Sequence, residues 1–188
     1  DDGYLSNYTL AYPILQKYGM KATIFAIGVS FGKDHYKDTD YAMTPHFGAA
    51  EAKEMTDSGL ISIQSHTYDM HQWPPYEDGS AAVRGNILPL AGESEEAYVQ
   101  ALTEDFTKSR AQLEDATGQP VDVLAYPAGQ YSTLAQVTLQ ELGVHVTLST
   151  NPGVNTVVKG LPQTLYAMLR FGITDDITSA ALLALIGA

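Results

Sequence analysis

Predominantly apolar and predominantly polar stretches alternate along the chain, and the apolar ones predict strands of a parallel sheet. Continuous apolar runs, as opposed to strictly alternating ones, are typical of strands that are covered on both faces. The four clearest runs are "KATIFAIG" (21–28), "LISIQSH" (60–66), "VDVLAYP" (121–127) and "VHVTLST" (144–150).

Stretches with helical spacing lie between these strands. A first helix is expected to begin at Ser6 or Asn7 and to end at Gly19. Ser94 is a suitable N-cap for a long helix that runs to about Ala116. Further helices are predicted over 48–59, 132–143 and 175–188, the last with Asp175 or Asp176 near its start.

The alternation of strands and helices predicts an α/β fold with a mainly parallel sheet, either open or closed into a barrel. In both architectures the carboxyl ends of the strands form the working face. Residues 72–93 are rich in proline and glycine and show no period, so they predict a long surface loop. With 188 residues the chain is long enough for one domain, 1–188.

Composition narrows the possible partners. The net charge of −12 argues against a nucleic-acid partner and against an anionic membrane surface, because both attract basic proteins. No apolar run reaches the length of a membrane-spanning helix, so no membrane insertion is expected. Cysteine is absent, so a metal would have to be bound by histidine and carboxylate.

Residues suited to metal binding follow the predicted strands or open the chain. Asp1 and Asp2 precede the first helix, and His66 and His71 follow the second apolar run. Two histidines and one carboxylate are a common ligand set for a catalytic transition metal, and the second acid would remain free as a base. Taken singly, each pattern is weak, since Asp-Asp-Gly is also an ordinary turn and two nearby histidines occur by chance.

Three motifs in order resemble the polysaccharide deacetylase family (NodB homology, carbohydrate esterase family 4). "DDG" (1–3) is similar to the end of the family's Thr-Phe-Asp-Asp-Gly motif, and "HTYDMH" (66–71) to its histidine motif. The longer spacing of the two histidines resembles the branch that deacetylates poly-β-1,6-N-acetylglucosamine. "AYPAG" (125–129) is similar to Arg-x-Pro-Tyr-Gly, with Ala125 and Ala128 in place of the arginine and the tyrosine.

The resemblance implies a distorted (β/α) barrel of about seven mainly parallel strands. The first of these strands would precede Asp1, so the chain is expected to be truncated at its N-terminus. It also implies metal-dependent hydrolysis of the acetamide of N-acetylglucosamine units in a polysaccharide, with release of acetate. An N-acetylated glycan would be the partner, and the protein would be extracellular or in the cell envelope of a bacterium.

The resemblance also implies roles for single residues. Asp1 would be the general base, while Asp2, His66 and His71 would bind one divalent metal. Zinc is expected, although nickel, cobalt or iron would also suit these ligands. Arg170 would either orient Asp1 or be a surface residue of the last strand.

The third motif and the long loop would contact the substrate. The backbone N–H of Ala128 would stabilise the oxyanion, and Tyr126 and Pro127 would shape the groove wall. Trp73 and Tyr76 would either stack on a sugar ring or pin the loop to the body. Asp69 is expected to bond backbone N–H groups of the turn between the histidines.

One family feature is missing, because the last segment contains no histidine to act as the general acid. The acid could lie upstream of Asp1, or the activity could be weak; His46 and His35 are the other candidates. Two alternatives therefore stay open. One is a carbohydrate-binding relative without catalysis, and the other is a metal hydrolase for a small acetylated amide or ester, with the loop 72–93 as a lid.

Overall fold

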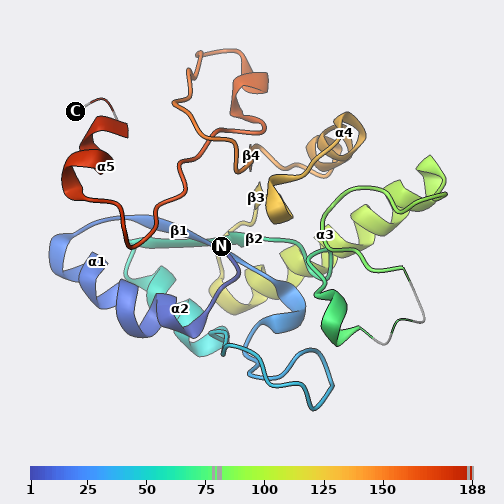
Figure 1. Cartoon of the computed structure of the whole chain (residues 1–188), viewed down its shortest axis with the longest axis horizontal. Helices are drawn as coiled ribbons and strands as arrows, with labels where there is room; N and C mark the ends of the chain where they lie inside the picture. Colours follow the sequence, from blue (N-terminus) through green and yellow to red (C-terminus); the bar gives the residue numbers. More distant parts are fainter. Residues whose placement is uncertain (78, 80–81, 186, 188) are drawn as a thin grey trace.

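The computed structural model describes residues 1–77, 79, 82–185 and 187, and its centre is a parallel sheet (Figure 1). The strands lie in the order β1-β2-β3-β4, and each neighbouring pair is parallel. Their bounds are β1 (Ala22–Ala26), β2 (Ile61–Ser65), β3 (Val123–Ala125) and β4 (Val146–Leu148). The predicted α/β fold and parallel sheet are confirmed. The described residues form four strands, fewer than the expected barrel would have.

Helices connect the strands as the crossovers of a parallel sheet require. The α-helices are α1 (Tyr12–Tyr18), α2 (Ala49–Asp57), α3 (Glu95–Thr117), α4 (Thr133–Glu141) and α5 (Ser179–Leu185). A π-helical turn, η1 (Asn7–Ala11), precedes α1, and short 3₁₀ turns are η2 (Gly28–Ser30), η3 (Pro74–Tyr76), η4 (Pro127–Gly129) and η5 (Pro162–Leu165). The predicted cap at Ser94 is present, since its hydroxyl accepts the N–H of Ala97 at 3.2 Å. No helix among the described residues is both long enough and apolar enough to cross a membrane.

The first helix begins and ends where it was predicted, and the start of the last helix needs correction. The first helix enters through the wide turn η1, which ends just before Pro13, where the missing N–H interrupts the helical ladder. Helix α5 begins only at Ser179, because the hydroxyl of Thr178 accepts the N–H of Ala181 at 3.2 Å and Asp175 and Asp176 lie before it. The predicted end of this helix falls on residues 186 and 188, which lie outside the described residues.

Arg170 was expected in a last strand, and this is also wrong. The segment runs beside β4 but makes only a single parallel bridge, between Leu148 and Met168. The backbone N–H of Arg170 instead bonds the carbonyl of Asn151 at 2.9 Å, in the turn after β4. Arg170 therefore lies at the carboxyl end of the sheet without belonging to it.

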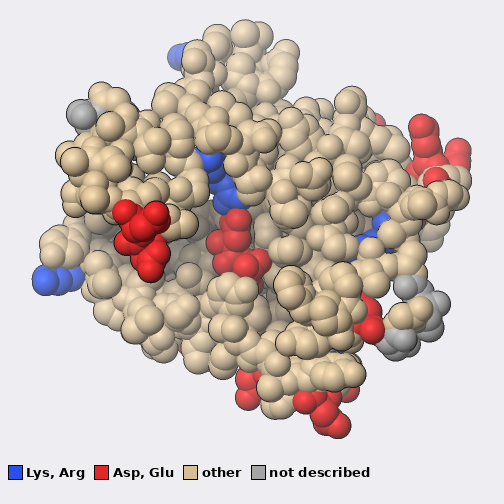
Figure 2. Space-filling model, in the orientation of Figure 1, with Lys and Arg blue, Asp and Glu red and all other residues tan. Residues whose placement is uncertain are grey.

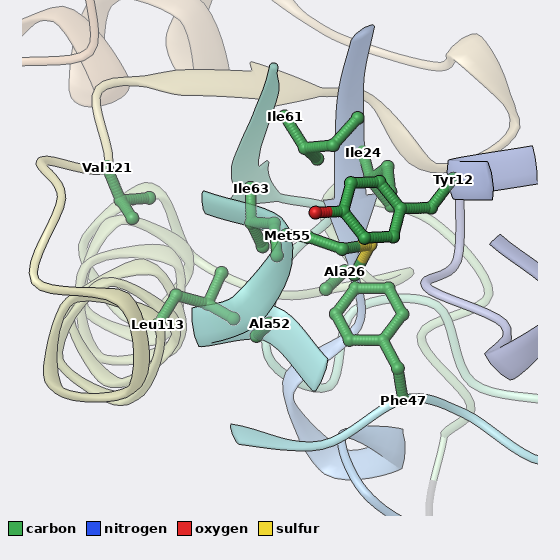
Figure 3. Close-up of a cluster of buried hydrophobic side chains, with 10 residues drawn as sticks. All are labelled: Tyr12, Ile24, Ala26, Phe47, Ala52, Met55, Ile61, Ile63, Leu113 and Val121. Atoms are coloured by element: carbon green, nitrogen blue, oxygen red, sulfur yellow. The ribbon is translucent and has the colours of Figure 1, made fainter. Parts of the chain in front are cut away.

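A first core cluster covers one face of β1 and β2 (Figure 3). The strand register places Ile24 opposite Ile63, and both side chains are buried against α2, where Met55 is fully buried. The other face is more open, because Thr23 and Ser62 lie opposite each other and are exposed. Burying side chains of this size contributes about 1.5–3 kcal/mol each, which fixes α2 and the two strands together.

Helix α3 connects this cluster to a second one. Its Leu113 belongs to the first cluster, whereas its Leu102 and Phe106 pack in the second with Leu124 of β3 and Leu139 of α4. All five side chains are fully buried. A long helix that is anchored at both ends in this way forms a firm support behind the carboxyl ends of β2 and β3.

Candidate metal centre and active site

Three side chains of the metal-binding type converge at the carboxyl end of the sheet. Asp2 Oδ1 lies 3.5 Å from His66 Nε2 and 3.7 Å from His71 Nε2. One possible ligand atom from each of the three residues lies within 4.8 Å of the other two. The rings of His66 and His71 stand nearly perpendicular, with centroids 5.2 Å apart. The structure therefore brings together the three residues that the sequence predicts as ligands.

The protonation state of His66 suits a bound cation. His66 is buried, and its Nδ1 lies 2.8 Å from the carbonyl oxygen of Ala125. Because a carbonyl can only accept, Nδ1 carries the proton and the lone pair of Nε2 points toward Asp2. Burial lowers the pKa of His66 to about 4, so the ring is neutral at physiological pH.

The carboxylate of Asp2 also fits a metal ligand. Its Oδ1 is buried and has no hydrogen-bond partner among the described residues. A buried carboxylate oxygen without a donor is costly unless a cation neutralises it. Two imidazoles and one carboxylate form the donor set of catalytic zinc sites and of related transition-metal sites. The residues present therefore fit a divalent metal.

The backbone around Asp2 explains how it reaches this position. Asp2 and Gly3 both have left-handed backbones, with φ of 69° and 85°. A side chain at Gly3 would meet Ala26 of β1 at 3.1 Å, so glycine is required at this close approach. The carbonyl of Asp2 accepts the N–H of Ile27 at 3.2 Å, which fixes it to the end of β1.

Asp1 is held by a bidentate ion pair with Arg170. Nη1 and Nη2 of Arg170 donate to the two carboxylate oxygens of Asp1 at 2.8 and 2.9 Å. Nε of Arg170 donates to the carbonyl of Ser149 at 2.8 Å, so the guanidinium is fixed in turn. Figure 2 shows acidic side chains and a basic one meeting in a hollow at the middle of this face, where Figure 1 places the N-terminus. Such a pair keeps a carboxylate ionised and oriented.

The turn η4 after β3 carries the remnant of the third motif. Ala128 is exposed and has a left-handed backbone with φ of 54°. The side chains of Tyr126 and Pro127 are buried, and Tyr126 stacks on Tyr131 with ring centroids 4.9 Å apart. The expectation that both side chains shape an open groove wall is therefore wrong, because core packing encloses them. They support the turn from beneath.

A pocket of about 410 Å³ opens beside the three ligands. Trp73, which is 56% exposed, and Tyr76 line this pocket. Of their two expected roles, stacking on a sugar ring requires such a position. Its lining residues are Asp2, Tyr4, Ile27, Ser30, Tyr36, Met43, Thr44, His46, His71, Trp73 and Tyr76. In the sequence, most of the segment from Tyr36 to His46 looks like an ordinary polar loop. The sequence therefore does not predict that this segment lines the pocket.

The two histidine candidates for the general acid, His46 and His35, differ in burial and in position. His46 lines the pocket, is largely buried, and has an Nδ1 without a hydrogen-bond partner among the described residues. Its ring lies against Tyr4, with centroids 4.9 Å apart. His35 is exposed and pairs with the neighbouring Asp34 at 2.8 Å. Of the two, only His46 is placed to meet a substrate.

The turn between His66 and His71 is held differently from the expectation. Asp69 does not bond the N–H groups of this turn; its carboxylate pairs with Lys37 at 3.0 Å. Lys37 also pairs with Glu77 at 2.6 Å, which joins the loop after η2 to the loop after His71. The acceptor for the turn is Asp105 of α3, which the sequence places far from the motif.

A family model described as polysaccharide deacetylase matches residues 1–147. The chain belongs to the polysaccharide deacetylase family. The family that the motifs predict is thus confirmed. YxkH of Bacillus subtilis (strain 168) is 31% identical over 181 residues, which are 96% of this chain and 52% of YxkH. The poly-β-1,6-N-acetyl-D-glucosamine N-deacetylase of Staphylococcus aureus (strain MRSA252) is 30% identical over 129 residues, 69% of this chain and 38% of that protein.

Two solved structures share this fold. IcaB from Ammonifex degensii matches with a TM-score of 0.75 and 25% identity, over 100% of this chain and 71% of that chain. The de-N-acetylase from Aggregatibacter actinomycetemcomitans matches with a TM-score of 0.79 and 20% identity, over 98% and 72% of the two chains. The chain spans about half the length of YxkH and a smaller share of the staphylococcal enzyme.

Proposed function

We propose that this chain carries out metal-dependent hydrolysis of the acetamide of N-acetylglucosamine units in a polysaccharide, releasing acetate. One observation carries the proposal. Three ligand-type side chains lie within 4.8 Å of one another beside Asp1, a second carboxylate that Arg170 holds in a bidentate pair. The staphylococcal relative that acts on poly-β-1,6-N-acetyl-D-glucosamine supports this substrate class.

Asp2, His66 and His71 would hold the metal. When bound, a divalent transition metal supplies Lewis acidity and lowers the pKa of water, and zinc is the metal we expect. Asp1 takes a proton from the attacking water, and its pair with Arg170 keeps it ionised for this task. The water oxygen adds to the acetamide carbon, the C–N bond breaks, and acetate leaves while the amine stays on the sugar.

Two further groups serve the reaction. The backbone N–H of Ala128, at the exposed turn η4, donates to the developing oxyanion. The amine must gain a proton as the C–N bond breaks, and His46 is the histidine in the pocket beside Asp2 and His71 that could assist the leaving group. A histidine that reaches the site from outside the three motifs favours catalysis over a binding role alone.

The finer expectations about the whole protein rest on the family resemblance. We propose that residues 1–188 form one catalytic domain, that this domain has the architecture of a barrel of about seven strands, and that the protein works outside the cell or in the bacterial envelope. Trp73 and Tyr76 would contact the sugar next to the reacting unit, because aromatic faces bury well against sugar rings.

Acetate release from N-acetylglucosamine oligomers of increasing length tests the proposal. The wild type should release acetate, lose this activity with a chelator and regain it with added zinc. Longer oligomers should react faster than the monosaccharide. Metal binding without acetate release from any oligomer would support a carbohydrate-binding relative, and hydrolysis confined to small acetylated esters or amides would support the small-molecule alternative.

A further inference from the structure

The turn that separates the two metal-binding histidines is under backbone strain. Thr67 is fully buried and has a left-handed backbone with φ of 71°, a conformation that a β-branched residue rarely adopts. Such a residue costs of order 1–3 kcal/mol and persists only when the surroundings impose it. The conformation of this turn determines where His71 lies relative to Asp2. The groups that hold the turn therefore affect the geometry of the metal centre.

Asp105 of α3 accepts two hydrogen bonds from the backbone of this turn. Its two carboxylate oxygens accept the N–H groups of Tyr68 and Asp69, at 2.8 and 2.7 Å. Consecutive N–H groups next to a left-handed residue form a concavity that suits an anion. Each oxygen satisfies one donor, so the carboxylate fits the turn as a bidentate clamp.

The same helix holds the turn at a second point. The hydroxyl of Ser65, at the end of β2, lies 2.8 Å from that of Ser109 and accepts the N–H of Thr67 at 3.0 Å. The hydroxyl of Thr67 accepts the N–H of Met70 at 3.2 Å and closes the turn. Because α3 packs in both core clusters, these bonds tie the turn to a helix that is held along its length.

We propose that Asp105 is a positioning residue of the metal centre: its carboxylate fixes the turn after His66 so that His71 meets Asp2. This inference rests on the proposed metal-dependent function. It assigns a role to a residue that lies outside the three motifs and outside the pocket beside the ligands. Asp105 acts through the backbone and touches neither the metal ligands nor the substrate.

The environment of Asp105 supports a role beyond stability. Burial raises the pKa of this carboxyl to about 6, and the nearby Asp69 carboxylate adds to the rise, while the two N–H bonds and Arg84 oppose it. Ionised Asp105 therefore costs folding free energy at neutral pH. A carboxylate kept in such a place is typical of functional sites, where geometry is held at the expense of stability.

The test compares cobalt binding by the wild type with that of Asp105→Asn and Asp105→Ala. An asparagine has one carbonyl oxygen, so one of the two turn N–H groups would face its NH₂ group; alanine removes both acceptors. Asp115→Asn makes the same chemical change at an exposed position of α3 and is the matched control. Cobalt affinity is measured by competition with a chelator, and the visible cobalt spectrum reports the coordination.

The proposal predicts a graded loss. Cobalt affinity should fall by about tenfold in Asp105→Asn and further in Asp105→Ala, as when outer-shell partners of metal ligands are removed. The cobalt spectrum should change, the amides of Tyr68 and Asp69 should exchange hydrogen faster, and Asp115→Asn should match the wild type. A folded Asp105→Asn with wild-type affinity and spectrum would overturn the inference.

Other outcomes separate this inference from the proposed function. An Asp105→Asn protein that loses its fold would also overturn the inference, because Asp105 would then support the whole domain. If the wild type binds no cobalt, both the proposed function and this inference fail. A third outcome is that the wild type binds cobalt and the cobalt affinity falls stepwise in the Asp105 variants, but no acetate is released from oligomers. The proposed function then fails and the positioning role stands.

Discussion

The two ends of the parallel sheet differ more in their chemistry than in their shape. At the amino end of β1 and β2 lies the larger hollow, of about 670 Å³, against about 410 Å³ for the pocket at the carboxyl end. Yet the polar groups of the amino end satisfy one another. Gln64 bonds Ser62, the carbonyl of Pro120 and the N–H groups of Asp122 and Val123.

The carboxyl end shows the opposite condition. Asp2 Oδ1 and His46 Nδ1 are buried and have no hydrogen-bond partner among the described residues. Left-handed backbones at Asp2, Thr67 and Ala128 also fall at this end. Unsatisfied polar atoms and local strain cost folding free energy, and at this end of the sheet a bound ligand can compensate for them. If the candidate site were chosen by pocket volume alone, the amino end of the sheet would be selected.

The largest effect should come from removing a metal ligand at the carboxyl end. His66→Ala should abolish both metal binding and acetate release, because the two remaining ligands cannot hold the metal. Ser62→Ala, at the exposed face of the amino end, is the control and should keep both. Metal analysis and an acetate assay on N-acetylglucosamine oligomers measure the pair. Equal loss in the two variants would contradict the contrast between the two ends.

Asp1→Asn should separate metal binding from catalysis. Acetate release should fall by about 10²–10⁴-fold, the usual contribution of a general base, while metal content stays at the wild-type level. The asparagine retains one oxygen for Arg170 but cannot take a proton from water. Steady-state kinetics with metal analysis on the same samples is the measurement, and a variant with full kcat would remove Asp1 from the mechanism.

Arg170→Lys tests whether the bidentate pair matters beyond its charge. Lysine keeps a positive charge near Asp1 but cannot form the two-point contact or the bond to the carbonyl of Ser149. A charge-assisted bond is worth about 1.5–3 kcal/mol, so kcat should fall about 10- to 100-fold. The metal affinity should not change. A wild-type kcat in this variant would restore the reading of Arg170 as a surface residue.

Trp73→Ala tests the pocket rim with a smaller expected effect. Loss of an aromatic contact of about 0.5–1.5 kcal/mol should raise KM for oligomers by about two- to tenfold. Activity on a small acetylated substrate should change little, since such a substrate reaches the metal without the rim. If KM stays constant for every oligomer length, Trp73 only pins the loop.

A last, separate effect concerns stability and pH. Because the pKa of Asp105 is raised from 3.8 to about 6 in the folded state, its favourable contribution is complete below pH 4. It is lost as the pH rises through about 6, so the free energy of unfolding should fall across this window. Urea unfolding of the metal-free wild type and of Asp105→Asn measures the difference. The variant should lack that part of the fall, and identical pH profiles would show that burial does not perturb this carboxyl.

Sequence patterns predict the strands and the candidate ligands. They fail where a feature depends on contacts between residues that are far apart in the sequence. The apolar runs around Ile24 and Ile63 locate the strands, because buried parallel strands require such runs. The convergence of Asp2, His66 and His71 was predictable too, since all three belong to family motifs. The short bridge at Met168 in place of a last strand was not predictable, because it depends on tertiary pairing and not on local propensity.

Asp105, which no sequence pattern pointed to, and His46, which the sequence offered only as one of two histidine candidates, share one physical cause. The role of Asp105 depends on a helix crossing behind β2, and that of His46 depends on a polar loop folding back over Asp2. Neither leaves a periodic or short-range signal. Tyr126 shows the converse error: its motif position suggested a groove wall, but the second core cluster encloses its side chain completely.

Metal stoichiometry by equilibrium dialysis against zinc tests the central claim most directly. That claim is that the carboxyl end of the sheet, through Asp2, His66 and His71, is a metal centre. The account predicts one zinc ion per wild-type chain and none in Asp2→Ala, with Ser62→Ala retaining the ion. No zinc in the wild type, or an ion that persists in Asp2→Ala, would contradict it.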